Sequence, residues 1–337
     1  MLSKFRGCLL AGACGDALGG SVEFHPLSYM LGRYGPKGIT EMNLHGGYAE
    51  VTDDTQMDIY TAQGIIHAVR KNCDYNGMVQ EIYKSYVLWY RGQMSDYDGS
   101  TPIQDDLITD ENSKRLYENR APGNTCLVAL GSGIMGTRTR QLNDSKGCGG
   151  VMRAAPAGLY YYKNPEMAYE LGCDLAAITH SHPLGYQSSG ALAMIVANVL
   201  QGDAISVAVK KTIDFLHQKE ECSEMEQWLQ KAVDAVVSGP EYPKVYDVLK
   251  AGWVGEEALA IAVWAAMKYP NDLKEAIVKA VNHSGDSDST GAICGYIIGA
   301  SLGEEAIPAS WLEHLELKDM IVSQADTLCT MTQYAVS

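Results

Sequence analysis

The sequence predicts an all-α protein, folded as a single compact bundle of many helices. Apolar residues recur at helical spacing in segments rich in Ala, Leu, Met and Glu, namely residues 58–69, 190–200, 256–267 and 272–281. Alternating runs are scarce, and only residues 159–162, where aromatic side chains cluster, suggest a strand. The chain of 337 residues is 46% hydrophobic, which suffices for a large core.

Glycine, proline, aspartate and serine mark the connections between these helices. They collect in residues 26–47, 92–124, 141–150 and 238–244, none of which is composed like a flexible linker. Residues 96–118 hold several carboxylates beside Lys114 and Arg115, which favours a solvated surface loop. We therefore expect one domain over residues 1–337.

The net charge and the cysteines limit the class of protein. A formal charge of -15 argues against nucleic-acid binding, which needs a local surplus of Lys and Arg. The longest apolar stretches are too short to span a bilayer, and the apolar run before Cys14 is too short for a secretory leader. Nine scattered cysteines without a CxxC pair are typical of reduced thiols. We expect a cytoplasmic protein with neither a nucleic-acid nor a membrane partner.

Two acidic clusters near opposite ends of the chain give the strongest functional signal. They are Thr52-Asp53-Asp54-Thr55 and Gly285-Asp286-Ser287-Asp288-Ser289-Thr290, and each precedes a predicted helix. Ordinary N-capping needs one Asp or Ser, whereas each of these helix starts carries two carboxylates and several hydroxyls. If the fold unites the clusters, their carboxylates repel one another unless protons or cations lie between them. Oxygen ligands favour a hard divalent cation.

The helix after the second cluster has an unusual face. Gly291, Gly295 and Gly299 recur at every fourth position, although glycine costs about 1 kcal/mol relative to alanine at a helix position. We expect this face to pack tightly against another helix.

Two familiar motifs match the second cluster only in part. The spacing of Asp286, Asp288 and Thr290 fits the first half of a calcium-binding EF-hand loop, but its closing glutamate would fall at Ile297. The same residues resemble an Asp-x-Asp-x-Thr phosphatase signature, which requires an apolar strand before the first aspartate. A polar loop precedes it here.

Two further stretches are weaker signals. His180 and His182 precede a predicted helix, and a loop with capping and packing roles is as good an interpretation as a ligand pair, since zinc would need further ligands. Residues 145–150 form a Gly-rich loop that would let a phosphate approach the backbone, although no complete phosphate-loop motif is present. Cys148 is a candidate nucleophile, but a bystander thiol is favoured because no base is adjacent in the sequence.

Taken in order, these segments resemble the ADP-ribosylglycohydrolase family, also called dinitrogenase-reductase-activating glycohydrolases. The matching pieces are residues 5–8, 15–19, 23–24, 52–55, 120–123, 147–153, 179–186, 252–253, 256–259 and 285–290. The resemblance covers nearly the whole chain, and its two acidic motifs are highly specific. It implies an all-α bundle with a binuclear centre, two Mg²⁺ or two Mn²⁺, in a central cleft.

The resemblance also implies a role for individual residues. The metal ligands would be Thr52, Asp53, Asp54, Asp286, Asp288 and Ser289, with Thr290 as a weaker candidate. The catalytic residues would be Glu23, Asp54 and Asp288, where Glu23 lies near the metals and moves on substrate binding, and Asp16 supports the Glu23 loop. Substrate contacts would come from Ser145, Gly147, Cys148, Gly149, Gly150, His180, His182 and Tyr186.

The function implied is metal-dependent removal of ADP-ribose from modified protein arginine by cleavage of an N-glycosidic bond. Ser287, Ser289 and the His180 to Tyr186 stretch resemble arginine-specific members more than serine- or polymer-specific ones. Two cations would bind the ribose hydroxyls and position a water during an oxocarbenium-like reaction. Partners would be an ADP-ribosylated protein and, in addition, an ADP-ribosyltransferase, a toxin included, or its target. The alternatives are hydrolysis of a serine, polymer or small-molecule linkage, or a non-catalytic structural or toxin-binding member.

Overall fold

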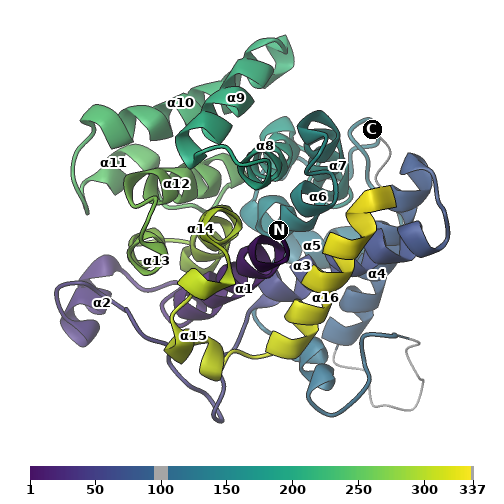
Figure 1. The fold of residues 1–337 in the computed structure, drawn as a ribbon, viewed down its shortest axis with the longest axis horizontal. Coiled ribbons are helices and arrows are strands. Elements are labelled where there is room, and N and C mark those ends of the chain that lie inside the picture. The colour runs from purple at the N-terminus through teal and green to yellow at the C-terminus, as the bar shows by residue number, and fades with distance from the viewer. Residues whose placement is uncertain (95–104, 335–337) are drawn as a thin grey trace.

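The computed structural model describes residues 1–94 and 105–334, and over these residues the chain is all-α (Figure 1). The α-helices are α1 (Leu2–Gly20), α2 (Leu27–Tyr34), α3 (Asp53–Arg70), α4 (Tyr75–Gln93), α5 (Asn124–Gly131), α6 (Ala155–Tyr160), α7 (Pro165–Ala177), α8 (Pro183–Leu200), α9 (Ile205–His217), α10 (Ser223–Ser238), α11 (Val245–Leu249), α12 (Gly255–Lys268), α13 (Leu273–Val281), α14 (Ser287–Leu302), α15 (Ala309–Glu313) and α16 (Lys318–Met331). Short 3-10 turns are η1 (Ser113–Tyr117), η2 (Cys148–Arg153), η3 (Glu220–Cys222), η4 (Glu304–Ala306) and η5 (Thr332–Tyr334).

The helices predicted from periodicity are confirmed, and they correspond to α3, α8, α12 and α13. The strand suggested for residues 159–162 is wrong, because residues 155–160 form α6, which Pro156 starts from its first turn. The predicted loop of residues 26–47 contains the short helix α2.

The prediction that residues 96–118 form a solvated surface loop is also partly wrong. Its residues 96–104 lie outside the described chain, but Asp105 is buried and accepts a hydrogen bond of 2.6 Å from the Tyr60 hydroxyl. Tyr60 lies inside α3, so Asp105 fastens this segment to the core. The spacing of charges along the chain cannot predict that a carboxylate will be buried against a hydroxyl partner from another segment.

Helices α1 and α14 form the centre of the molecule, and both are seen nearly end-on in Figure 1. A Cβ added to Gly15 would lie 2.0 Å from the Gly291 carbonyl oxygen, and one added to Gly295 would lie 2.1 Å from that of Ala11. Gly299 meets Gly7 in the same way. The pairing runs antiparallel, and the prediction that the glycine face packs tightly against another helix is confirmed.

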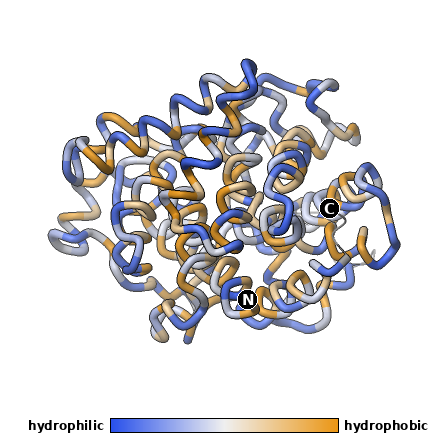
Figure 2. Tube along the Cα trace, turned by 45° about the horizontal axis from the view of Figure 1, so that its top comes forward, coloured by the Kyte–Doolittle hydropathy of each residue, from blue (hydrophilic) through white to orange (hydrophobic). Residues whose placement is uncertain are grey.

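The remaining helices enclose this pair. Every residue of α14 from Ser287 to Ala300 is buried, with α3, α8, α12 and α13 packed against it and α16 packed against α1. Figure 2 shows apolar residues recurring turn by turn along the helices, while hydrophilic stretches dominate the outer loops. A central helix surrounded by protein needs no polar face, which is why α14 is apolar on every side from Gly291 to Ala300.

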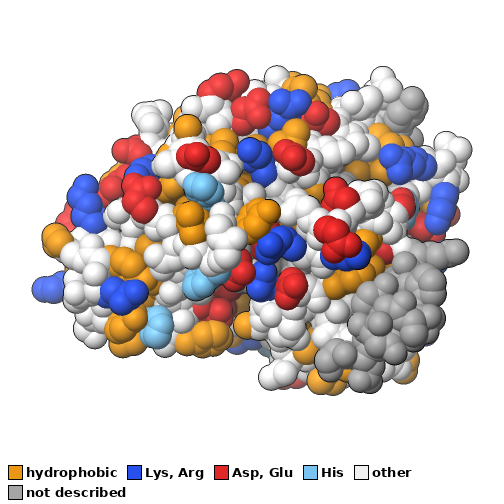
Figure 3. Space-filling view, turned by 90° about the horizontal axis from the view of Figure 1, so that it is seen from below, with side chains coloured by type: hydrophobic (Ala, Val, Ile, Leu, Met, Phe, Trp, Pro, Cys, Tyr) orange, Lys and Arg blue, Asp and Glu red, His pale blue; other side chains and the backbone are white. Residues whose placement is uncertain are grey.

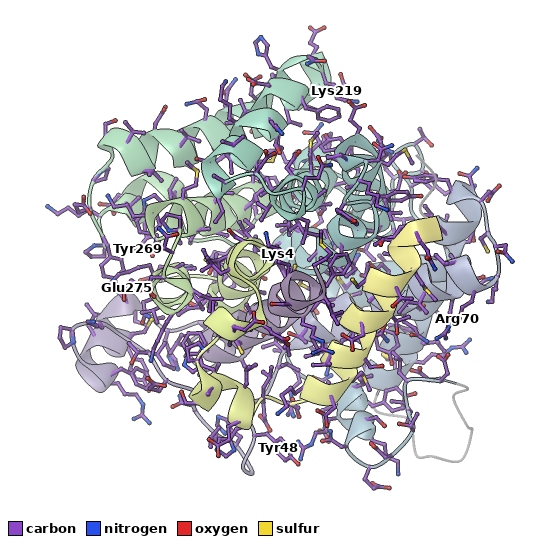
Figure 4. The ribbon with its side chains drawn as sticks, in the orientation of Figure 1. Lys4, Tyr48, Arg70, Lys219, Tyr269 and Glu275 are labelled. Atoms are coloured by element: carbon purple, nitrogen blue, oxygen red, sulfur yellow. The ribbon has the colours of Figure 1, made fainter. Side chains whose placement is uncertain are left out.

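Helices α9, α10 and α11 form an outer layer on α8 and α12, at the edge of the bundle in Figure 1. Figure 4 shows Lys219 at one end of this layer and Tyr269 and Glu275 near α12 and α13, while Lys4 lies on α1 at the centre of the view. On the face shown in Figure 3, acidic and basic side chains lie interspersed with apolar ones. None of the helices in the described ranges has the length and hydropathy to cross a bilayer.

Candidate metal centre and active-site cleft

The antiparallel packing of α1 on α14 brings the end of one helix to the start of the other. Gly19 lies against the backbone of Ser287, and the chain turns directly afterwards, where the Glu23 amide donates to the Gly19 carbonyl at 2.9 Å. This turn places Glu23 beside the second acidic cluster. One carboxylate oxygen each of Glu23, Asp286 and Asp288 lies within 4.8 Å of the others.

Helix α1 also holds the start of α3. Both carboxylate oxygens of Asp16, which is fully buried, accept from the Thr52 amide at 3.1 and 3.0 Å, and Oδ2 accepts from the Thr55 amide at 3.1 Å and from its hydroxyl. The resemblance implies that Asp16 supports the Glu23 loop, and its hydrogen bonds in the structure fix the first turn of α3. One helix therefore orients both acidic clusters.

The two clusters meet across a cleft. Asp53 and Asp54 from α3 and Asp286, Asp288 and Ser289 from α14 all line it, together with Glu23. Asp286 and Thr52 are the N-caps of their helices and accept from the Ser289 and Asp54 amides respectively. The cavity has a volume of about 400 Å³ and is open to solvent.

A buried ion-pair network holds the loop that faces Asp53. The Gly123 amide donates to Asp53 Oδ2 at 3.2 Å, and Arg120 at the start of that loop pairs with Glu316 at 3.1 Å. Glu316 is 1% exposed, pairs also with Arg115 at 3.0 Å, and accepts from the Val51 amide at 3.1 Å. Glu316 thus links the loop of residues 120–123 to the segment entering α3.

Replacing Glu316 with alanine is expected to lower the free energy of unfolding by about 3 kcal/mol, because the Arg115 guanidinium and the Val51 amide lose this acceptor and Arg120 keeps only Glu50, at 3.2 Å. Chemical denaturation measures the loss. Glu313→Ala is the matched control, because Glu313 is exposed on α15 nearby and should change stability little. Equal stability of the two variants would contradict a structural role for the network.

The carboxyl groups of the cleft disfavour ionisation. Burial, followed by the charges of Asp286 and Asp53, raises the pKa of Glu23 to about 8. Burial raises the pKa of Asp53 to about 7, and it raises the pKa values of Asp54 and Asp288 well above their ordinary range. Neither Lys nor Arg is among the described residues that line the cleft, so no basic side chain there would neutralise the negative charge of ionised carboxylates.

Two oxygen atoms in the cleft lack any partner among the described residues. They are Asp54 Oδ2 and Asp288 Oδ1, both buried, one from each acidic cluster. A buried carboxylate oxygen without a donor costs free energy that a cation would recover. The donor set consists of carboxylate and hydroxyl oxygens, which suits Mg²⁺ or Mn²⁺. The residues therefore fit a divalent cation centre, and the ligands and number of ions proposed from the sequence stay a proposal.

Divalent cations are expected to raise the melting temperature, and to raise it more at pH 8.5 than at pH 6.5. The raised pKa values mean that Glu23 and Asp53 keep protons in the folded protein where the unfolded chain has released them. Stability from this source is present at low pH and is lost as the pH rises through about 7 and 8, when cations replace the lost protons.

Differential scanning fluorimetry of chelator-treated protein measures this gain at both pH values. The cation, Mg²⁺ or Mn²⁺, is added at roughly 5 mM, which saturates a weak site. Glu23→Gln is the control, because an amide does not titrate and should reduce the pH dependence of the gain. A gain that is the same at both pH values would contradict the electrostatic explanation.

The Gly-rich loop contributes part of the cleft lining. Gly147, Cys148 and Gly149 line the cavity, whereas Ser145 and Gly150 are not among its lining residues. The Ser145 hydroxyl is 3.1 Å from that of Thr125, and a Cβ on Gly150 would lie 2.9 Å from Cβ of Ala176 in α7. Substrate contacts through the backbone of residues 147–149 are therefore geometrically open.

Cys148 points at the acidic cluster. Its Sγ donates to Asp286 Oδ2 at 2.7 Å, and burial, reinforced by the charge of Asp286, raises the pKa of the thiol well above its usual value. A thiol that keeps its proton is a poor nucleophile. The structure favours the interpretation of Cys148 as a bystander that contacts a proposed metal ligand.

The candidate histidines separate into two environments. His180 lines the cleft, whereas His182 is the N-cap of α8 and accepts from the Leu184 amide through Nδ1 at 3.1 Å. Tyr186, one turn into α8, is not among the residues that line the cavity. The positions of His182 and Tyr186 are thus accounted for by helix capping and by packing, respectively.

Two proposed metal ligands of hydroxyl type also differ in position. Ser289 lines the cleft, while Thr52 lines a smaller adjoining hollow of about 210 Å³ with Glu23 and Arg120. Thr290, the weaker candidate, is fully buried with its hydroxyl hydrogen-bonded to the Asp286 and Ala280 carbonyl oxygens. Its side chain therefore serves the first turn of α14.

An aromatic pair at the mouth of the cleft was missed by the sequence interpretation. The rings of Phe24 and Trp253 stack with their centroids 5.4 Å apart, and 67% and 42% of these residues are exposed. Phe24 has a φ of 64°, a left-handed conformation that costs free energy in a residue with a side chain. Both residues stood in matched motifs, but nothing in their types alone indicated that they would meet.

The comparisons with known proteins agree over the whole length. The family model of the ADP-ribosylglycohydrolases matches residues 1–335. The ADP-ribosyl-[dinitrogen reductase] glycohydrolase of Rhodospirillum rubrum is 25% identical, over 93% of this chain and 90% of that protein. The ADP-ribosylarginine hydrolase Tri1 of Serratia proteamaculans is 25% identical, over 98% of this chain and 80% of its own. A solved structure titled "ADP-ribosylglycohydrolase-related protein complex" superposes with a TM-score of 0.70 at 25% identity, covering 98% of both chains.

Proposed function

The chain belongs to the ADP-ribosylglycohydrolase family, and on that basis we propose that it is a divalent-metal-dependent hydrolase that removes ADP-ribose from modified arginine side chains. The observation that carries the proposal is the cleft in which carboxylates from α1's end, α3 and α14 converge without a basic side chain among the described lining residues. Such a site has little structural purpose, since it costs the fold stability. It fits a substrate reached through cations.

The proposed ligands are Asp53 and Asp54 with Thr52 on one side, and Asp286, Asp288 and Ser289 on the other. When bound, the cations would supply positive charge that holds the ribose hydroxyls and stabilises charge developing at the anomeric carbon. The chain's own residues supply orientation, because Asp16 and the α1–α14 contact fix both helix starts before substrate arrives. We assign proton transfer at the reacting water to the carboxyl group of Glu23.

Glu23 suits that role by its position. It lies on the turn after α1 rather than in a helix, it contacts both the cleft and the adjoining hollow, and it is partly exposed. Among the acidic residues of the cleft it is the one with access to solvent, which a group that exchanges protons requires. Asp54 and Asp288 are buried and serve as ligands rather than as proton carriers.

A second hollow extends the cleft. It has a volume of about 570 Å³, it shares Asn124 and Thr125 with the cleft, and its other lining residues include Val128 and Leu142 with the amide of Gln141. An apolar surface with an amide suits a purine ring, so we assign the adenosine end of the substrate to this hollow. The ribose at the acidic cluster and the adenine would then lie on opposite sides of Thr125.

An arginine linkage is the best-supported choice among the family's substrates. Relatives whose names specify arginine cover nearly the whole chain, and the second acidic motif carries Ser287 and Ser289. A guanidinium leaving group is cationic, and it would depart through a mouth formed by Glu23 and the Phe24–Trp253 pair, where no Lys or Arg lines the described part of the cleft. Acidic and aromatic groups both attract such a cation.

The test is a panel of substrates offered to the same protein with Mg²⁺, with Mn²⁺ and with a chelator. Proteins carrying ADP-ribose on arginine or on serine, the ADP-ribose polymer, and a small-molecule ADP-ribosyl ester are assayed for released ADP-ribose. Cation-dependent release from arginine alone is the expected result. Preferential release from another substrate would overturn the arginine assignment, and no release from any of them would favour a non-catalytic binding role.

A further inference from the structure

A buried arginine lies beneath the floor of the cleft. Arg153, in η2, is fully buried, and its guanidinium carbon lies 4.1 Å from the centroid of the Tyr86 ring. Its Nη2 donates to the Thr179 hydroxyl at 2.7 Å, and its Nη1 donates to Met57 Sδ at 3.0 Å. No carboxylate among the described residues pairs with it, so its charge is not consumed by an ion pair within the described structure.

The hydrogen bonds from Arg153 favour one protonation pattern at Thr179 and His180. A guanidinium can only donate, so the Thr179 hydroxyl oxygen is the acceptor of that bond. The hydroxyl hydrogen must then go to another group, and the nearest acceptor is His180 Nδ1 at 2.9 Å, compared with the Ala176 carbonyl at 3.5 Å. Because the hydroxyl is closer to Nδ1 than to the Ala176 carbonyl oxygen, the geometry favours Nδ1 as the acceptor, and in a neutral imidazole that leaves the proton on Nε2.

Nε2 of His180 faces the Gly-rich loop. A Cβ added to Gly149 would lie 3.2 Å from Nε2, and one added to Gly147 would lie 3.5 Å from it. Among the described residues, no group hydrogen-bonds this nitrogen, although His180 lines the cleft. The glycines keep the space in front of Nε2 clear for a ligand.

The ring stays neutral. Burial, with the charge of Arg153 added to it, lowers the pKa of His180 to about 3. A protonated ring would donate from both nitrogens and would lose the bond from Thr179. At physiological pH the ring is thus an uncharged donor with a defined direction.

We propose that Arg153 and Thr179 are positioning residues that hold His180 as its Nε2–H tautomer, so that Nε2 donates a hydrogen bond to an oxygen of the bound ADP-ribose above residues 147–149. The identity of this ligand rests on the proposed function, whereas the tautomer does not. The arrangement explains why a buried cation is kept under a cleft that has no basic side chain among its described lining residues. Arg153 acts on His180 through the Thr179 hydroxyl and does not itself contact the ligand.

The tautomer is measured first in the unaltered protein. Nitrogen-15 NMR of histidine-labelled protein should give His180 the pattern of a protonated Nε2 and an unprotonated, hydrogen-bonded Nδ1. Substituting Thr179→Val removes the hydroxyl while keeping the shape, so the two tautomers should then interconvert, whereas Thr179→Ser should restore the original pattern. An Nδ1–H tautomer in the unaltered protein would overturn the inference without any variant.

Ligand binding is measured next, by calorimetry with ADP-ribose as the probe. Thr179→Val should weaken binding roughly tenfold, the effect of one hydrogen bond to a charged or polar oxygen, and Thr179→Ser should bind nearly normally. Thr212→Val is the matched control, because Thr212 is also fully buried and bonds a carbonyl one turn back in α9, which does not line the cleft.

The outcomes separate this inference from the proposed function. An unchanged tautomer and an unchanged affinity in Thr179→Val would overturn the positioning role even if the protein hydrolyses its substrate normally. Failure of the unaltered protein to bind ADP-ribose would overturn the ligand and the proposed function together, and the NMR pattern would still decide the tautomer. Equal weakening by Thr212→Val would show that the loss at Thr179 is only structural.

Discussion

Substituting Asp54→Asn or Asp288→Asn is expected to reduce release of ADP-ribose from an arginine-modified protein by at least about 10³-fold, equivalent to about 4 kcal/mol of transition-state stabilisation. Each of these residues has a buried oxygen without a partner in the described structure, one from α3 and one from α14. Asparagine keeps the volume but removes the charge and replaces one oxygen with a group that cannot bind a cation.

Two measurements accompany the activity assay. Calorimetric titration with Mn²⁺ should show weaker cation binding in both variants, and the melting temperature in chelator should be unchanged or higher, because repulsion in the cleft is relieved. Asp203→Asn is the control, since Asp203 pairs with Lys211 at 2.6 Å between α8 and α9 and does not line the cleft. Full hydrolysis by both cleft variants would sink the proposed mechanism.

Introducing valine at Gly295 is expected to destabilise the fold by at least about 3 kcal/mol or to prevent folding altogether. Its Cβ alone would lie 2.1 Å from the Ala11 carbonyl oxygen in the facing helix, and that atom belongs to the backbone of α1. A side chain can turn aside, whereas two central helices can separate only by losing contacts along their whole length.

The matched control is the same substitution at Gly32. This residue lies within α2, and nothing occupies the space within 4 Å of an added Cβ. Valine there should leave stability nearly unchanged or improve it slightly, since glycine is the poorer helix former. Guanidinium denaturation compares the two variants. Similar stability in both would show that the α1–α14 contact tolerates separation.

The sequence reveals the helices of this protein more fully than its site. Periodicity located α3, α8, α12 and α13 because each spans several turns with a buried face. It missed α2, which has eight residues between Pro26 and Gly35, and it suggested a strand at residues 159–162 because aromatic residues favour strands until packing decides.

The two acidic clusters were recognised because their composition is abnormal for a helix start. The sequence alone could not show that the clusters meet in one cleft, because residues 53–54 and 286–288 are brought together by the packing of a third helix, α1. The role of Asp16 and the stacking of Phe24 on Trp253 depend on that same packing. The resemblance groups His182 with His180 as a substrate contact, whereas in the structure the His182 ring accepts from the Leu184 amide and caps α8.

The pairing of α1 with α14 also sets the order in which the protein can acquire its site. The partners in this contact come from residues 7–19 and 287–303, so their association closes almost the whole chain into a loop. Contacts of such high sequence separation form late and slow folding. During synthesis the surface of α1 that packs on α14 is made first, and it stays uncovered until α14 has been synthesised. The carboxylates of the cleft are therefore brought together only near completion of folding, and the chain cannot bind its proposed cations at this centre before the rest of the bundle is in place.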